Sequence, residues 1–213
     1  MRVTFLYDNV SLRDDLEADW GFACLLETPG APAVLFDTGG SGEILLANMR
    51  RMDVSPRDVG TVFLSHAHFD HVGGLSAVLD ANPDARVVAP SSLRGIRRAR
   101  ETVYGPKPGP IHEGVFTTGE LSEGEQALAV RTDRGIAVVT GCAHPPLPEI
   151  LDAASAFGRV GALLGGLHDL GDLDLLEGLE LVCPAHCTRA KEEIHRRFPR
   201  TSVRAGAGLV LQV

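Results

Sequence analysis

Aromatic residues are scarce in this chain of 213 residues, which has one tryptophan, two tyrosines and eight phenylalanines. Its core must therefore rest on aliphatic side chains. Hydrophobic residues make up 44% of the chain and charged residues 23%, which is typical of a globular protein that buries a core. The length suits one large domain, and because no linker divides the chain we predict a single domain over residues 1–213.

Cysteines are also few, at four, and they are unevenly placed. That number and spacing do not suggest the disulfide framework of a small secreted protein. Cys183 and Cys187 bracket His186, but a structural zinc there would need a second pair of ligands that we do not find. The first residues have the pattern of a strand and lack the charged and apolar regions of a signal peptide. We therefore expect a cytoplasmic protein.

Two further absences concern partners. No apolar run approaches the ~18 residues that span a bilayer, so we expect no membrane partner. Positive charge is in deficit, with 20 lysines and arginines against 28 acidic residues and a net charge of −8. Nucleic-acid-binding proteins present a dense basic face, and we therefore expect no nucleic-acid partner. No residue pattern indicates an oligomeric state.

Short β-prone runs alternate with helical patterns along the chain. We predict strands over residues 3–7, 21–27, 33–37, 61–64, 86–89, 127–131, 135–140, 160–164, 179–183 and 208–213. Helices are predicted over residues 43–52, 75–81, 148–157 and 189–198. The five basic residues between Arg94 and Lys107 are interpreted as a solvent-exposed helix face, with an anion-contacting rim as the alternative. Strands with intervening helices indicate a layered α/β sandwich.

The strongest chemical signal is the run Ser65-His-Ala-His-Phe-Asp-His71, which follows the strand predicted over residues 61–64. It places four metal-competent side chains within six residues, namely His66, His68, Asp70 and His71. Side chains alternate along a strand and a tight loop can fold the run back, so two histidines can serve one cation and the other pair a second. Without a metal, these polar groups would crowd a core edge unpaired. Imidazole with carboxylate suits Zn²⁺, and also Fe or Mn.

The same run carries a family resemblance. Residues 61–75, Thr-Val-Phe-Leu-Ser-His-Ala-His-Phe-Asp-His-Val-Gly-Gly-Leu, resemble the signature of the metallo-β-lactamase superfamily. Upstream, Leu35-Phe-Asp-Thr-Gly39 is similar to that superfamily's first motif, in which an aspartate supports the metal ligands from behind; the resemblance assigns this role to Asp37. It implies a four-layer αββα sandwich and a centre with two divalent metal ions.

The resemblance narrows to the subgroup named for 7,8-dihydropterin-6-yl-methyl-4-(β-D-ribofuranosyl)aminobenzene 5′-phosphate synthase. The positions that carry it span nearly the whole chain: Tyr7-Asp-Asn9, Trp20-Gly-Phe22, Asn48, Thr118-Gly-Glu120, Gly141-Cys-Ala-His144, Gly165-Gly-Leu-His168 and His186-Cys-Thr188.

The superfamily adds a third histidine to the first metal, a bridging Asp or Cys, and a last histidine to the second metal. By this resemblance His186 is the last histidine, and the strand over residues 135–140 delivers Cys142 to the bridging position, where Asp is usual. We nevertheless interpret Cys142 as a small buried thiol beside the ligands. His144 and His168 each follow a strand and a glycine and are expected as the remaining ligands. For each histidine, the alternative is a hydrogen-bonded residue next to the ligands.

This site predicts a hydrolase. Two cations bridged by hydroxide supply a nucleophile at neutral pH and stabilise negative charge on the attacked centre. Asp70 would hold the second metal and orient the nucleophile, and His168, if it binds no metal, is the candidate general acid or oxyanion donor. We expect hydrolysis of an ester or phosphoester in a small molecule, which is anionic because the two cations make the pocket attractive to anions.

Three other functions remain as alternatives. A synthase-type transfer on a pterin or ribosyl-phosphate substrate follows from the subgroup, although the segment 89–117 is short for the lid that the subgroup carries there. A metal-binding or redox protein without hydrolase activity is a second. A nuclease is a third, and the acidic net charge argues against it. His112 and His195 are expected at the surface.

Overall fold

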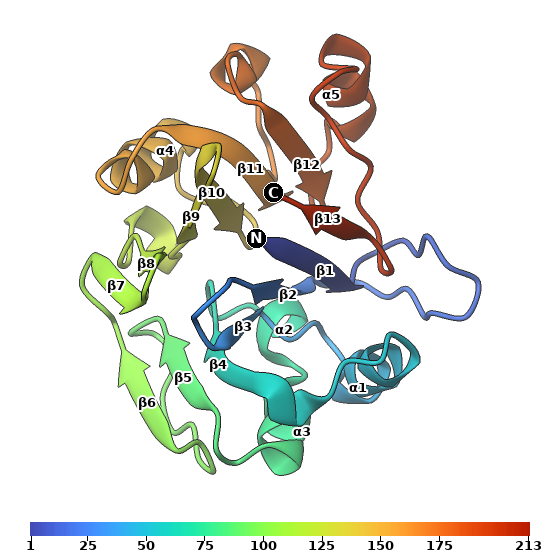
Figure 1. Cartoon of the computed structure of the whole chain (residues 1–213), viewed down its shortest axis with the longest axis vertical. Helices are drawn as coiled ribbons and strands as arrows, with labels where there is room; N and C mark the ends of the chain where they lie inside the picture. Colours follow the sequence, from blue (N-terminus) through green and yellow to red (C-terminus); the bar gives the residue numbers. More distant parts are fainter.

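The computed structural model describes residues 1–213, which form two β-sheets with helices on their outer faces (Figure 1). The first sheet has seven strands in the order β13-β1-β2-β3-β4-β5-β6. Its strands are β1 (Arg2–Tyr7), β2 (Ala23–Glu27), β3 (Ala33–Phe36), β4 (Val59–Phe63), β5 (Arg86–Ala89), β6 (Glu101–Tyr104) and β13 (Val210–Gln212). The second has six strands in the order β12-β11-β10-β9-β8-β7. These are β7 (Gly109–His112), β8 (Val115–Thr117), β9 (Leu128–Thr132), β10 (Gly135–Thr140), β11 (Val160–Gly166) and β12 (Leu181–Ala185).

Five α-helices accompany the sheets: α1 (Gly42–Arg51), α2 (Phe69–Val72), α3 (Leu75–Ala81), α4 (Leu147–Ser155) and α5 (Lys191–Arg197). In Figure 1, α1 and α3 lie on the outer side of the first sheet, and α4 and α5 on the outer side of the second. None of these helices is long and apolar enough to cross a membrane.

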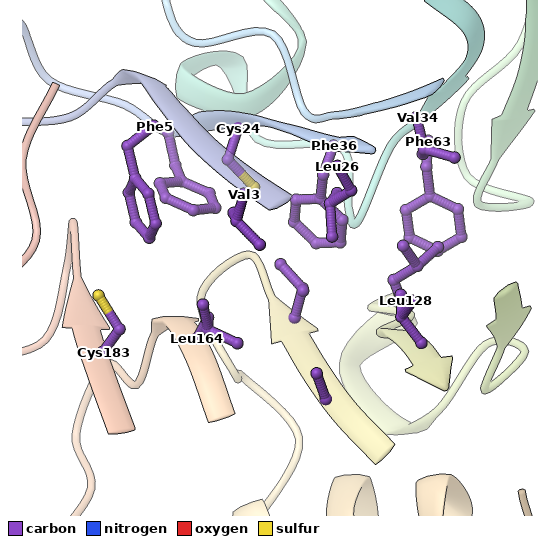
Figure 2. Close-up of a cluster of buried hydrophobic side chains, with 14 of the residues drawn as sticks. Val3, Phe5, Cys24, Leu26, Val34, Phe36, Phe63, Leu128, Leu164 and Cys183 are labelled. Atoms are coloured by element: carbon purple, nitrogen blue, oxygen red, sulfur yellow. The ribbon is translucent and has the colours of Figure 1, made fainter. Parts of the chain in front are cut away.

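The sheets are held together by a core of 18 buried residues, to which both contribute. Along β1 the side chains alternate, so that Val3 and Phe5 enter this inner core while Leu6 joins the cluster under α1 and α3. Figure 2 shows the inner core, with Phe36 and Phe63 of the first sheet above Leu128 of the second. The two phenylalanine rings stack with centroids 5.4 Å apart.

Each outer face has a core of its own. Fifteen buried residues fill the space between the first sheet and its helices, and thirteen fill the space between the second sheet and α4 and α5. The order of layers is therefore helix, sheet, sheet, helix, and the predicted four-layer αββα sandwich is confirmed.

Parallel pairing decides where the chemistry lies. In the first sheet β3, β4, β5 and β6 run parallel, and in the second β10, β11 and β12 do so. Carboxyl ends of parallel strands meet at one edge of a sheet, and loops there lie next to one another although they are distant in sequence. Asp37 follows β3, Ser65 follows β4, Cys142 follows β10, His168 follows β11 and His186 follows β12.

Most of the elements predicted from sequence are present. The helix over residues 75–81 and the strand over 86–89 have the predicted bounds, and the strands predicted over 127–131 and 135–140 form the antiparallel pair β9 and β10. Three strands, β6, β7 and β8, and the helix α2 were not predicted. Each has only three or four residues, which is too short to display a hydrophobic period.

The interpretation of the arginine-rich segment as a helix face is wrong. Gly95 and Arg98 have φ values of 73° and 66°, which no right-handed helix accommodates. The Arg94 guanidinium lies over the Tyr104 ring, 5.5 Å from its centroid, and Arg98 pairs with Asp80.

His112 and His195, which we expected at the surface, are partly exposed, and each ring also contacts a hydroxyl group. His112 Nε2 lies 2.8 Å from Thr61 Oγ1, and His195 Nδ1 lies 3.0 Å from Ser202 Oγ.

Asn48 of α1 fastens the long loop between β1 and β2 to the rest of the first sheet. Its side chain is fully buried, and its amide nitrogen donates to the carbonyls of Leu6 and Glu17 at 3.0 and 2.8 Å. Its amide oxygen accepts from the backbone N–H of Glu17 at 3.0 Å. The loop carries Asn9 and Trp20 toward the carboxyl edge described above.

Replacing Asn48 with alanine is expected to lower the free energy of unfolding by about 3 kcal/mol, since it leaves three backbone groups without their partner. Urea unfolding measures the change. Arg50→Ala, at an exposed position of the same helix, serves as the control and should change stability by about 0.5 kcal/mol or less. A loss below about 1 kcal/mol in Asn48→Ala would show that the loop does not depend on this side chain.

Candidate metal centre

Six of the residues named from sequence converge as two groups of three at the carboxyl edge. His66, His68 and His144 offer ring nitrogens that all lie within 4.8 Å of one another. The rings of His66 and His68 have centroids 4.6 Å apart, and that of His144 lies 4.7 Å from His66. The first two follow β4 and the third follows β10, so this group joins the two sheets.

Asp70, His71 and His186 form the second group, with ligand atoms again within 4.8 Å of one another. Asp70 and His71 lie in the short helix α2, and His186 follows β12 of the other sheet. The groups are adjacent, since the centroids of the His66 and His71 rings are 4.2 Å apart. A close turn makes this possible: a Cβ on Gly73 would stand 2.3 Å from the carbonyl oxygen of Gly40, so only glycine fits.

Hydrogen bonds at Nδ1 hold the histidine rings in place. His71 Nδ1 donates to Asp37 Oδ2 at 2.7 Å. His66 Nδ1 lies 2.9 Å from Ser65 Oγ, which in turn donates to Asp37 Oδ2 at 2.7 Å. Asp37, predicted as a residue that supports the ligands, thus reaches two of them. Burial raises the pKa of Asp37 to about 7, and the hydrogen bonds from Ser65 act against that rise.

His186 is fixed by Asn9. The Asn9 amide oxygen accepts from Gly21 N–H at 3.1 Å, while its nitrogen donates to the His186 carbonyl at 3.1 Å. This orientation leaves the amide oxygen as the acceptor for His186 Nδ1 at 2.9 Å. With Nδ1 protonated in the neutral ring, Nε2 carries a lone pair.

The atoms that the two groups of residues turn toward each other are suited to binding a cation. Burial, with neighbouring imidazoles, lowers the pKa of His66 and of His71 to about 3, so both rings are neutral at pH 7. Nε2 of His66 and Nε2 of His186 are buried and have no hydrogen-bond partner. His186 Nε2 stands 3.1 Å from Asp70 Oδ2, where a lone pair meets a carboxylate oxygen. A cation between such atoms removes the cost of burying them unpaired.

Cys142 lies between the two groups. Its Sγ is 3.3 Å from His71 Nε2, and it falls within 4.8 Å of the ligand atoms of His66 and His71 together. The sulfur of Cys142, which we expected beside the ligands, lies close to the ring nitrogens of two predicted ligands, His66 and His71. A thiolate is an established ligand of Zn²⁺ at about 2.3 Å.

His168, the remaining predicted ligand, belongs to neither group of three. Its ring is 5.3 Å from that of His144, and its ligand atom lies within 4.8 Å of those of Cys142 and His144. The Nδ1 atom is buried without a hydrogen-bond partner, although the side chain as a whole is 35% exposed. His168 therefore lies at the edge of the centre, between the ligand atoms and solvent.

Glu125 was not predicted as a site residue, yet its carboxylate fixes residues 142–144 on one side of the centre. Its Oε1 accepts from the backbone N–H of Cys142 and Ala143 at 2.9 and 3.0 Å, and its Oε2 from the backbone N–H and Nδ1 of His144 at 3.0 and 2.8 Å. Burial opposes its ionisation, but these donors lower the pKa of Glu125 to about 2. In the sequence Glu125 is one of three glutamates between residues 120 and 125, and no local pattern distinguishes it.

Backbone strain is concentrated here as well. Of seven non-glycine residues with positive φ, four lie in the centre: Asp37 (56°), Ala143 (57°), His168 (20°) and His186 (45°). Such conformations persist where the surroundings over-determine them, and they cluster at functional sites.

A comparison with known proteins agrees with this geometry. Residues 21–155 match the model of the metallo-β-lactamase superfamily. The 7,8-dihydropterin-6-methyl-4-(β-D-ribofuranosyl)-aminobenzene-5′-phosphate synthase of Methanocaldococcus jannaschii is 24% identical over an alignment of 246 positions, which covers 84% of each protein.

Among solved structures, the metal-dependent hydrolase Tm1679 of the β-lactamase superfamily is 29% identical and has a TM-score of 0.76, with 100% of this chain and 99% of that one covered. Human tRNase Z, short form, has a TM-score of 0.67 at 14% identity, with coverage of 100% and 99%, and it shares the fold alone. The family match extends over more than half of the residues, and the chain belongs to the metallo-β-lactamase superfamily.

Proposed function

We propose that the protein is a metal-dependent hydrolase that acts on an ester or phosphoester of a small, anionic molecule. The observation that carries this proposal is the pair of adjacent three-residue groups, in which the buried Nε2 atoms of His66 and His186 have no hydrogen-bond partner. His66, His68 and His144 would hold one divalent ion. Asp70, His71 and His186 would hold the other, and Cys142, which lies between the two groups, would offer a thiolate. Zinc suits this set of nitrogen, oxygen and sulfur donors, and iron or manganese is the alternative.

Two bound cations supply a nucleophile at neutral pH, because they lower the pKa of water, and they stabilise negative charge on the attacked centre. The chain's own residues then orient and transfer protons. Asp70 stays ionised for this work: burial acts to raise its pKa, but the adjacent rings of His186 and His71 outweigh burial and keep the pKa below its usual range. His168, half-exposed beside His144, is the proposed proton donor or oxyanion contact for the substrate.

A small anionic substrate is compatible with the net charge of the protein. An anion is attracted by the two cations in spite of the net charge of −8, whereas a long nucleic acid would meet an acidic surface. The cytoplasm is the expected location, since the Cys142 thiol has Cys187 close by and must stay reduced to bind metal.

A synthase-type transfer is a second candidate, and the similarity to the methanogen synthase over 84% of both chains favours it. Both reactions use the same centre but give different products. Incubation with a dihydropterin diphosphate and ribofuranosylaminobenzene phosphate, followed by mass analysis, separates them. A coupled product would support the transfer, and hydrolysis of generic phosphodiester, lactone or thioester substrates alone would support the hydrolase.

Metal removal is expected to abolish hydrolysis, and added Zn²⁺ to restore it. His68→Ala and Asp70→Asn should each lower turnover by more than roughly 100-fold, beyond the loss that a missing supporting hydrogen bond causes, and elemental analysis should show less bound metal. His195→Ala removes a histidine outside the centre and should leave both values unchanged. Full activity of the metal-free protein would refute the proposal.

Glu125→Gln is expected to lower metal affinity and kcat/KM by roughly 10–100-fold, although Glu125 binds no metal. Each carboxylate oxygen accepts two N–H groups, and a glutamine would turn its own NH₂ group toward two of these donors. His144 would then lose its position. Glu113→Gln is the matched control at an exposed site. Competition with a zinc chelator measures affinity, and an unaltered value in Glu125→Gln would contradict the role.

A further inference from the structure

A second cavity, of about 430 Å³, opens beside the candidate metal centre. Two segments line it: the loop and first turn of α4 over residues 143–147, and the loop over residues 167–175 that follows β11. The walls are largely apolar and include Leu147, Leu167, Leu170 and Leu175. A cavity of roughly 150 Å³ accommodates benzene, so this one has room for a bicyclic group.

The cavity adjoins the reacting centre at His144. That side chain also lines a smaller cavity of about 170 Å³, whose wall includes His66 and His68. His168 lies on the side of the larger cavity, with its Nδ1 atom buried and unpartnered. A molecule bound with its reacting group against the histidines therefore has its next few atoms at the mouth of the apolar cavity.

The acidic residues that line the cavity are two aspartates, and the carboxylate of each already has a partner. No lysine or arginine lines it. Asp169 is paired with Arg189 at 2.7 Å, and the Asp172 carboxylate accepts from the backbone N–H of Asp174 at 3.0 Å. An anionic group placed here would meet two carboxylates and no free cation, whereas an uncharged group would exchange water for apolar walls.

We propose that this cavity, the apolar pocket, binds an uncharged, mainly apolar group of ring size belonging to the same molecule whose ester or phosphoester reacts at the metals. The inference rests on the proposed function for the position of the reacting group. The apolar pocket further implies that the substrate carries its negative charge only at the reacting ester or phosphoester. An aryl or similar apolar group would lie on the side of His168.

Binding of phosphate monoesters to the zinc-loaded protein, measured by calorimetry, tests this without requiring turnover. Affinity should rise by about tenfold or more from methyl phosphate to 2-naphthyl phosphate, because ring atoms enter the apolar walls. A carboxylate at the far end, as in 4-carboxyphenyl phosphate, should bind more weakly than phenyl phosphate.

Gly171→Trp adds a large side chain at a residue that lines the pocket and can accept one. A Cβ there meets only the Asp169 carbonyl oxygen, at 4.0 Å, and the residue has no positive φ. The variant should lose the gain for 2-naphthyl phosphate and bind methyl phosphate within about twofold of the parent. The control Gly171→Ala should keep the naphthyl gain and likewise bind methyl phosphate within about twofold of the parent. Leu175→Asn tests the opposite wall, and circular dichroism with metal content shows whether each variant is folded.

Equal affinity for methyl and naphthyl phosphates, or a naphthyl gain that persists in folded Gly171→Trp and Leu175→Asn, would overturn the apolar pocket. Failure of the proposed function is a different result: no metal-dependent hydrolysis of any ester, whatever the order of phosphate affinities.

Discussion

The imidazole rings of the candidate metal centre are held in place by hydrogen bonds at Nδ1. The geometry of the centre depends on these hydrogen bonds. His66, His71, His144 and His186 each have Nδ1 engaged by a hydrogen bond, to Ser65, Asp37, Glu125 and Asn9 respectively. A ring fixed in this way has one tautomer and one orientation, and its Nε2 points away from the support. Because the supports lie around the centre, the free nitrogens converge on a small volume.

Such convergence opposes folding. The neutral rings of His66 and His71 are brought together with the ring of His186 and the carboxylate of Asp70, and the buried Nε2 atoms of His66 and His186 have no hydrogen-bond partner. The sandwich imposes it through its three hydrophobic cores, which fix the positions of the strands. Four strained residues at strand ends then turn the chain toward the centre. A bound cation converts this stored cost into binding energy, which is why metal content and stability should be linked in this protein.

The sequence predicted the half of the centre whose residues lie close together along the chain. His66, His68, Asp70 and His71 lie within one run, and the spacing alone indicated that they act together. Asp37 was found only through its motif. His144 and His186 follow strands, and their convergence came from the family resemblance, since the pairing of two sheets cannot be read from either strand. Glu125 and Asn9 escaped as supporting residues because their function exists only in contacts with residues 19 and 177 positions away.

Similar reasoning explains the errors in the fold. The arginines after Pro90 were interpreted as a helix face from composition, but composition does not reveal a positive φ at Gly95 or Arg98. Strands β6, β7 and β8 are stabilised by neighbours that were themselves placed by distant parts of the chain. Their sequences have no period of their own to detect.

The surroundings of the centre also bear on which substrate it serves. A molecule with a second anionic end, such as a ribosyl phosphate next to a diphosphate, needs a second cationic site. Arg94 lies over Tyr104, Arg98 pairs with Asp80, and Arg189 is paired with Asp169 at the mouth of the apolar pocket. These guanidinium groups already have partners, so recruiting one for a phosphate would mean exchanging a contact at the protein surface. A substrate with one anionic group at the metals and an uncharged remainder requires no such rearrangement, and on this ground we favour hydrolysis of a singly charged ester over the two-phosphate transfer.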